Sequence, residues 1–152
     1  MRQIKVEFGE KDYRTEESFK TLRTNIIFSG VQNKVIAITS CTPNEGKSTT
    51  SMALAKSLAE SGKNVLMIDA DLRKSVFATK YTTNTEEIIG LSEYLSGQAT
   101  YEDVLYGTQN KNLDIIFAGA VPPNPVELLG STAFADLIKS SHESYDYVIV
   151  DA

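Results

Sequence analysis

The sequence predicts an α/β fold in which a parallel sheet is covered by helices on both faces. Four short runs of almost purely apolar residues recur along the chain, and strands that are buried on both faces have this composition. Segments with apolar residues at helical spacing separate these runs. The chain has 152 residues, of which 41% are hydrophobic and 23% charged, so we expect one domain with a buried core.

Two long helices are predicted in the first part of the chain. Phe19, Leu22 and Ile26 recur at helical spacing ahead of Gly30, and a second periodic segment ends at Gly62. Shorter periodic segments follow later in the chain. The expected helices cover residues 16–29, 47–61, 90–95, 100–105, 126–129 and 132–140.

The four apolar runs are short enough for each to be one strand. The first, Val35-Ile36-Ala37-Ile38, is expected to be buried on both faces. The expected strands cover residues 35–38, 65–68, 113–117 and 147–150. Residues 1–13 are polar, so we expect a flexible segment ahead of a domain of residues 14–152.

Composition excludes several classes of function. Fifteen Lys and Arg residues against twenty Asp and Glu residues give a net charge of −5, whereas nucleic-acid-binding proteins usually carry a basic excess. The single cysteine, Cys41, rules out an internal disulfide and a zinc site built from cysteines. No signal peptide or run of about 20 apolar residues is present, so we expect a cytoplasmic protein.

Residues 41–49 follow a predicted strand and open a predicted helix, which is the setting of a phosphate-binding loop. Lys47 would reach the β and γ phosphates, Ser48 would coordinate magnesium, and Gly46 allows close approach of the backbone. Cys41 stands where the pattern GxxxxGK[ST] has its first glycine, so an ordinary turn is the alternative. The expected nucleotide-binding residues are Thr42, Pro43, Asn44, Glu45, Gly46, Lys47, Ser48 and Thr49.

Acidic residues stand at the ends of two predicted strands. Asp69 ends one strand, Asp71 follows two residues later, and Asp151 ends the last strand. Ligands of open α/β sheets bind beyond the carboxyl ends of the strands, where carboxylates suit magnesium or the removal of a proton from a hydroxyl. A solvated acidic turn is the alternative for Asp69 and Asp71. Together with Lys47, the three acids predict a site at this edge of the sheet.

The segment from Asp69 to Arg73 resembles the second Walker motif of the bacterial tyrosine kinases (BY-kinases), regulators of capsular and extracellular polysaccharide synthesis. The phosphate-binding loop resembles their variant Walker A motif, with Asn44 in place of its first glycine. Further similar segments are residues 22–25 (LRTN), 90–97 (GLSEYLSG) and 119–129 (GAVPPNPVELL), so the resemblance covers nearly the whole chain from about residue 14.

This resemblance implies a P-loop NTPase fold of the MinD/ParA-like branch and ATP-dependent autophosphorylation of protein tyrosines. It implies that Ser48, Asp69, Asp71 and Asp151 hold Mg²⁺ directly or through water, while Lys47 neutralises charge on the phosphates. By the same resemblance, Asp69 activates the tyrosine hydroxyl. Arg73 is expected to orient the acidic turn.

The resemblance also implies partners. Glu17, Lys20 and Arg23 match an assembly motif through which the family's subunits pack into a ring, with Lys20 in place of an arginine. A solvated charged helix face is the alternative. The expected partners are further copies of the chain, protein tyrosine substrates, and a transmembrane activator or polysaccharide co-polymerase that recruits the protein to the inner face of the membrane.

Two other functions remain open at this point. A partitioning or cluster-carrier ATPase of the MinD/ParA type shares the Walker motifs, but Thr42 occupies the position of its signature lysine. A nucleotide-binding regulator without catalysis is the second. In the BY-kinases, the chain continues beyond the equivalent of Asp151, so we expect an incomplete domain here. The expected consequences are a last strand that lacks one neighbour, reduced stability and little autophosphorylation.

Overall fold

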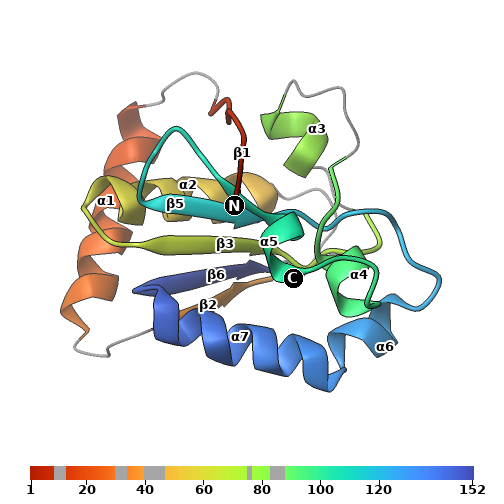
Figure 1. Cartoon of the computed structure of the whole chain (residues 1–152). Helices are drawn as coiled ribbons and strands as arrows, with labels where there is room; N and C mark the ends of the chain where they lie inside the picture. Colours follow the sequence, from red (N-terminus) through yellow and green to blue (C-terminus); the bar gives the residue numbers. More distant parts are fainter. Residues whose placement is uncertain (9–12, 30–33, 40–46, 75–76, 83–87) are drawn as a thin grey trace.

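The computed structural model describes residues 1–8, 13–29, 34–39, 47–74, 77–82 and 88–152. Within these residues, six strands form one sheet with helices on both faces (Figure 1). The strands are β1 (Arg2–Gln3), β2 (Lys34–Ile38), β3 (Val65–Asp69), β4 (Leu105–Gly107), β5 (Leu113–Ile116) and β6 (Tyr147–Asp151). The helices are α1 (Tyr13–Phe28), α2 (Lys47–Glu60), α3 (Phe77–Tyr81), α4 (Leu91–Leu95), α5 (Tyr101–Val104), α6 (Pro125–Leu129) and α7 (Thr132–Ser144).

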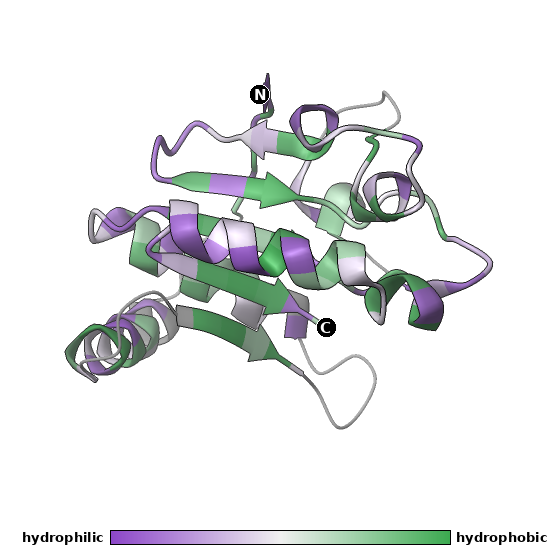
Figure 2. Cartoon of the chain, turned by 60° about the horizontal axis from the view of Figure 1, so that its bottom comes forward, coloured by the Kyte–Doolittle hydropathy of each residue, from purple (hydrophilic) through white to green (hydrophobic). Residues whose placement is uncertain are grey.

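The layers confirm the predicted α/β class. Helices α1 and α2 pack on one face of the sheet, and α7 lies across the other face with α4 to α6 (Figure 1). Side chains alternate between the two cores along each strand: Met67 of β3 faces α2, whereas Leu66 and Ile68 face α7. Strands β3 and β6 are therefore apolar along most of their length and end in an aspartate, and Figure 2 shows hydrophobic colour along the middle of the sheet.

The sheet has the order β1-β4-β5-β3-β6-β2. All neighbours are parallel except β4 and β5, which run antiparallel. Helix α5 forms where it was expected, with the Thr100 side chain accepting from the Asp103 backbone N–H. Strand β4 was not predicted, because it starts directly after this helix and has only three residues, too few to show a period.

The expectation of a loosely held start to the chain is wrong for residues 1–8. Strand β1 pairs with β4, and Ile4 and Val6 beyond it are buried, with 9% and 2% of their surface exposed. The Val6 backbone N–H donates to Gln109 Oε1 at 2.9 Å. Two apolar side chains therefore hold this otherwise polar segment against the core. The segment was not predicted to pack because two apolar residues are too few to show a hydrophobic period.

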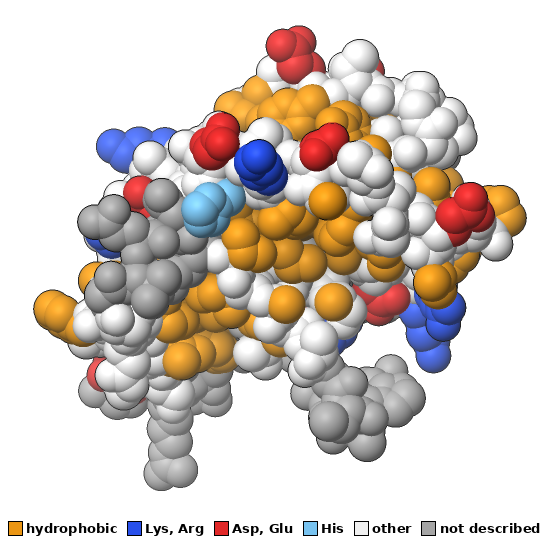
Figure 3. Space-filling view, turned by 90° about the horizontal axis from the view of Figure 1, so that it is seen from below, with side chains coloured by type: hydrophobic (Ala, Val, Ile, Leu, Met, Phe, Trp, Pro, Cys, Tyr) orange, Lys and Arg blue, Asp and Glu red, His pale blue; other side chains and the backbone are white. Residues whose placement is uncertain are grey.

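The expectation that the last strand lacks a neighbour on one side is also wrong. Strand β6 pairs with β3 on one side and with β2 on the other. The outer strand is instead β2, the apolar run that was expected to be buried on both faces, and Val35 within it is 41% exposed. Figure 3 views the molecule from this side, where hydrophobic side chains lie uncovered beside charged residues of α7. Spatial strand order differs from sequence order, so composition alone did not reveal the edge.

The remaining differences concern helices. Helix α3 lies in the part that looked irregular, and α7 extends four residues beyond its predicted end. The Ser131 side chain caps α7 by accepting from the Phe134 N–H. In the described part of the chain, no helix has the length and apolarity that crossing a membrane requires.

Candidate nucleotide site

Strand register brings two of the three predicted acids together. Asp69 of β3 and Asp151 of β6 are partners in the parallel ladder, at the last residue of each strand. The Ala70 backbone N–H donates to the Asp151 carbonyl oxygen at 2.8 Å. Both side chains are buried, with 0% and 1% of the residue surface exposed. The carboxyl edge of the sheet therefore carries adjacent buried carboxyl groups, as the sequence predicted.

Helix α2 places the ammonium group of Lys47 beside these acids. Lys47, its first residue, places Nζ 3.4 Å from Asp151 Oδ2 and 3.7 Å from Asp71 Oδ2. The same ammonium donates to the carbonyl oxygen of Ala152 at 2.6 Å. Asp71 is held beside Asp69 because its backbone N–H donates to Asp69 Oδ1 at 3.1 Å. The predicted lysine and its acids thus form one cluster at the N-terminus of α2.

Ser51 belongs to this cluster although sequence analysis did not select it. Its Oγ donates to Asp151 Oδ1 at 2.7 Å, and the residue is fully buried. Ser51 follows Lys47 by four residues, so both side chains leave the same face of α2. That spacing was visible in the sequence, but a serine in a helix has many other roles. Only the position of β6 gives it a carboxylate partner.

The electrostatics of Asp151 follow from its burial. Loss of hydration raises the pKa of its carboxyl group, and the hydrogen bond from Ser51 and the charge of Lys47 act in the opposite direction. Nearby Asp71 raises the pKa of Asp151 further. The ionised form of Asp151 therefore depends on Ser51 and Lys47 for its stability.

Several predicted site residues take other positions or lie outside the described residues. Arg73 is exposed and forms no ion pair with a described residue, and the acidic turn is instead held by backbone donors, including the Lys74 N–H to Asp71 Oδ1 at 3.2 Å. Within the described ranges, no three Asp, Glu, His or Cys side chains are arranged to hold a metal ion. Outside the described residues lie Thr42, Pro43, Asn44, Glu45 and Gly46, and the side chain of Ser48.

The predicted assembly face of α1 is divided in the structure. Glu17 and Lys20 form an exposed ion pair with 3.5 Å between Oε1 and Nζ. Arg23 instead turns toward α2, where its Nη1 donates to the Ser57 carbonyl oxygen at 3.2 Å. Glu17 and Lys20 are therefore available on the surface, whereas Arg23 helps to join α1 to α2.

A lysine at the start of a helix, facing acids at the carboxyl edge of a parallel sheet, defines a nucleotide-binding P-loop NTPase. The family model described as "AAA domain" matches residues 33–152, and the chain belongs to this family. Within it, the chain is a relative of the bacterial tyrosine kinases, as the sequence motifs indicated.

Two curated relatives show this relationship. Tyrosine-protein kinase CpsD of Streptococcus agalactiae is 46% identical over 138 residues, which are 91% of this chain and 60% of the relative. Tyrosine-protein kinase YwqD of Bacillus subtilis is 42% identical over 137 residues, which are 89% of this chain and 57% of the relative. The chain therefore spans about three fifths of the length of these relatives.

Solved structures agree with this placement. The kinase domain of Escherichia coli tyrosine kinase ETK superposes with a TM-score of 0.85 at 36% identity, covering 99% of this chain and 60% of that domain. The septum site-determining protein MinD from Pyrococcus horikoshii, complexed with Mg-ADP, gives a TM-score of 0.62 at 29% identity over 78% of this chain and 48% of that one. The predicted P-loop fold, related to that of MinD, is confirmed.

Proposed function

We propose that the protein is an ATP-dependent protein-tyrosine kinase that phosphorylates itself. The observation that carries this proposal is the contact of Lys47 with Asp71 and Asp151 at the N-terminus of α2. Phosphoryl transfer depends chiefly on positioning and on stabilising negative charge, and this cluster offers a cation and proton acceptors side by side. Relatives that are 46% and 42% identical to this chain bear the name of tyrosine-protein kinases.

Lys47 has the central role in binding the phosphates. Its side chain is 15% exposed and its ammonium group lies between two carboxylates, so a phosphate group at the helix N-terminus can replace Asp71 as its partner. The first-turn amides of α2 point toward the same place. The residues 42–49 are proposed to surround the β and γ phosphates.

The solvent exposure of Asp69 and Asp71 indicates which of them can accept a proton from the substrate. Sequence reasoning gave Asp69 the task of activating the tyrosine hydroxyl, but Asp69 is fully buried, whereas the Asp71 side chain is 31% exposed. Exposure therefore favours Asp71 as the proton acceptor, because a tyrosine from another chain must reach it. Asp69 then positions Asp71 through the bond that it accepts from the Asp71 backbone N–H.

Magnesium fits the chemistry of the donor set. Carboxylate and hydroxyl oxygens are the ligands that Mg²⁺ prefers, and it commonly retains several waters. Asp69, Asp71, Asp151 and Ser48 are proposed to hold the ion directly or through water. When bound, Mg²⁺ neutralises charge on the transferred phosphoryl group.

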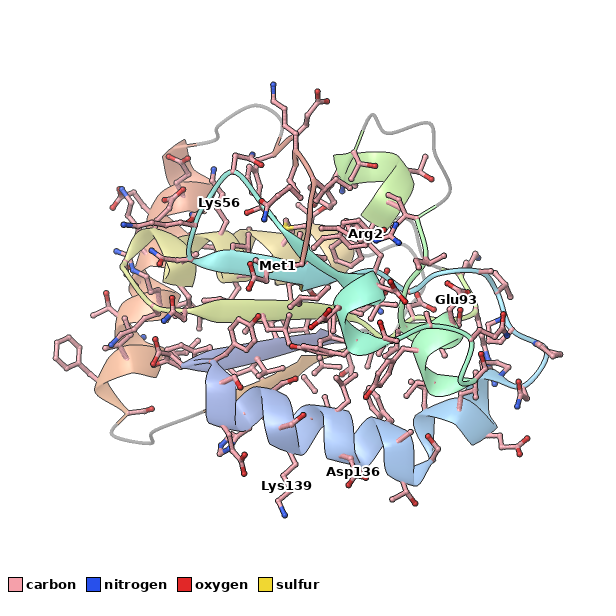
Figure 4. The ribbon with its side chains drawn as sticks, viewed as in Figure 1. Met1, Arg2, Lys56, Glu93, Asp136 and Lys139 are labelled. Carbon is pink, nitrogen blue, oxygen red and sulfur yellow. The ribbon has the colours of Figure 1, made fainter. Side chains whose placement is uncertain are left out.

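The test is phosphotyrosine formation by the protein with ATP, Mg²⁺ and a tyrosine-containing polymer as acceptor. Lys47→Met is expected to reduce the rate at least a hundredfold, because the cation that stabilises the phosphates is lost. Lys139→Met is the matched control, since Lys139 projects into solvent from α7 (Figure 4). An unchanged phosphotyrosine level in the Lys47 variant would contradict the kinase function.

A MinD-type ATPase is the second candidate, favoured by the structural likeness to MinD. The product separates the two: an ATPase of this type releases free phosphate on binding a partner, whereas a kinase leaves phosphotyrosine. A regulator without catalysis would bind ATP and yield neither product. Measurement of both products in one reaction therefore distinguishes all three functions.

The cellular role follows from the relatives' names. One relative is a putative tyrosine-protein kinase in the cps region of Klebsiella pneumoniae, 38% identical over 137 residues. We propose that this protein regulates capsular or extracellular polysaccharide synthesis together with a membrane co-polymerase, and that copies assemble through Glu17 and Lys20 on α1. Self-association of the protein, lost on Glu17→Lys but retained on Glu143→Lys, would support the assembly face. Co-purification with the membrane protein would support the partnership.

A further inference from the structure

Helix α3 lies beside the first turn of α2, and its contacts fix where its own side chains point. Phe77 and Tyr81, four residues apart, are buried at 1% and 4% exposure, and their rings stack with 5.5 Å between centroids. The Tyr81 carbonyl oxygen accepts from the Glu7 backbone N–H at 2.8 Å. The helix is thus attached both to the core and to the N-terminal segment.

Lys80, one of the two exposed residues of this helix, faces the nucleotide site. Lys80 donates through Nζ to the Thr49 hydroxyl, and Thr49 is the third residue of α2. The same ammonium lies 5.4 Å from the centroid of the Tyr81 ring. Burial raises the pKa of Tyr81, a hydrogen bond with Thr49 lowers it, and the charge of Asp151 raises it, which places α3 within electrostatic reach of the acids.

Lys80 and Lys47 approach the start of α2 from different sides. Lys47 and Ser51 point to the sheet, where both contact Asp151. Thr49 is two positions from Lys47, or about 200° around the helix, so its hydroxyl and Lys80 lie on a different side of α2 from Lys47 and Ser51. A phosphate chain at the helix N-terminus would therefore have an ammonium group on either side.

The charge of the site favours this second cation. Two carboxylates, those of Asp71 and Asp151, contact the Lys47 ammonium group, and Asp69 lies next to Asp71, whose backbone N–H donates to it; a nucleotide adds several negative charges of its own. Lys80 forms no ion pair with any carboxylate in the described ranges, and its partner there is a neutral hydroxyl. A phosphate is a stronger partner for an ammonium than a hydroxyl is.

We propose that Lys80 is a second phosphate-binding residue. When a nucleotide binds, the Lys80 ammonium group exchanges the Thr49 hydroxyl for the phosphate chain. The inference rests on the proposed nucleotide site and adds a ligand-binding residue from an element outside its two sequence motifs. A lysine binds phosphate as a point charge, so an arginine at this position should keep most of the function.

The experiment measures the affinity of the protein for ADP with Mg²⁺ by calorimetry, with inorganic pyrophosphate as a competitor. Lys80→Met is expected to weaken binding of both ligands about tenfold, the effect of losing one charge-assisted hydrogen bond. Lys80→Arg should remain within about threefold of the unaltered protein. Lys139→Met, on the far side of the sheet, makes the same change in charge and should have no effect.

Each other outcome overturns the inference. Equal affinity for ADP in the Lys80→Met variant and the unaltered protein would show that the ammonium does not contact the ligand. Weaker ADP binding with unchanged pyrophosphate binding would place Lys80 at the nucleoside. A fall in the unliganded melting temperature that Lys80→Arg shares would assign the loss to the packing of α3. Failure of the unaltered protein to bind ADP would instead refute the proposed function.

Discussion

The hydrogen bond from Ser51 to Asp151 offers a sharp test of the site. Ser51→Ala removes the donor but leaves the carboxyl group in place, 1% exposed. A hydrogen bond to a charged partner contributes about 1.5–3 kcal/mol, so we expect the free energy of unfolding to fall by about 2 kcal/mol at pH 8. For a urea m value of about 2 kcal/mol/M, the unfolding midpoint moves by about 1 M.

The loss should depend on pH with a definite sign. Burial raises the pKa of Asp151 above its unfolded value, so its protonation favours folding: this contribution is present below the unfolded pKa and is lost as pH rises through the folded pKa. Removing Ser51 raises the folded pKa further. The difference between variant and parent is therefore larger at pH 8 than at pH 5.

Urea unfolding without nucleotide, at both pH values, provides the measurement. Ser140→Ala is the matched control: Ser140 is exposed on α7 and its Oγ donates to the Leu137 carbonyl oxygen at 3.2 Å. Its free energy of unfolding should change by less than about 0.5 kcal/mol at either pH. Equal midpoints for the two variants at pH 8 would refute the assigned role of Ser51.

Two further predictions test the start of the chain and the acids. Val6→Ala should lower the free energy of unfolding by about 1–3 kcal/mol because Val6 is buried, whereas Lys5→Ala, at an exposed neighbour, should change it little; equal urea midpoints would contradict the packing of this segment. Asp71→Asn should reduce phosphotyrosine formation at least a hundredfold while ADP affinity changes only a few fold. A full rate in that variant would exclude Asp71 as the proton acceptor.

The sequence was informative about the site because phosphate binding has a local signature. Lys47 opens the first helix after a strand, and Asp69 and Asp151 each end an apolar run. In a parallel sheet all such ends meet at one edge, so their proximity followed from the fold class. The fold class itself followed from hydrophobic periodicity, which each segment shows by itself.

Other members of the site had no such signature. Ser51 acquires its role from β6, which is 100 residues away in the sequence, and Lys80 acquires its contact from the packing of α3 on α2. Arg23, selected from a motif, bonds instead to α2. These contacts depend on which elements become neighbours, and that information is spread over the whole chain.

By itself, therefore, the sequence determined most of the elements, their layering and the position of Lys47 at the edge of the sheet that carries Asp69 and Asp151. These features depend on residues that are close together in the sequence: the period of the side chains, the ends of the strands and the N-terminus of the helix. Only the tertiary structure decided that β6 lies between β3 and β2, that β2 is an edge, and that residues 1–8 are packed. Strand order is set by the burial of apolar faces between segments far apart in the chain, and no local pattern records it.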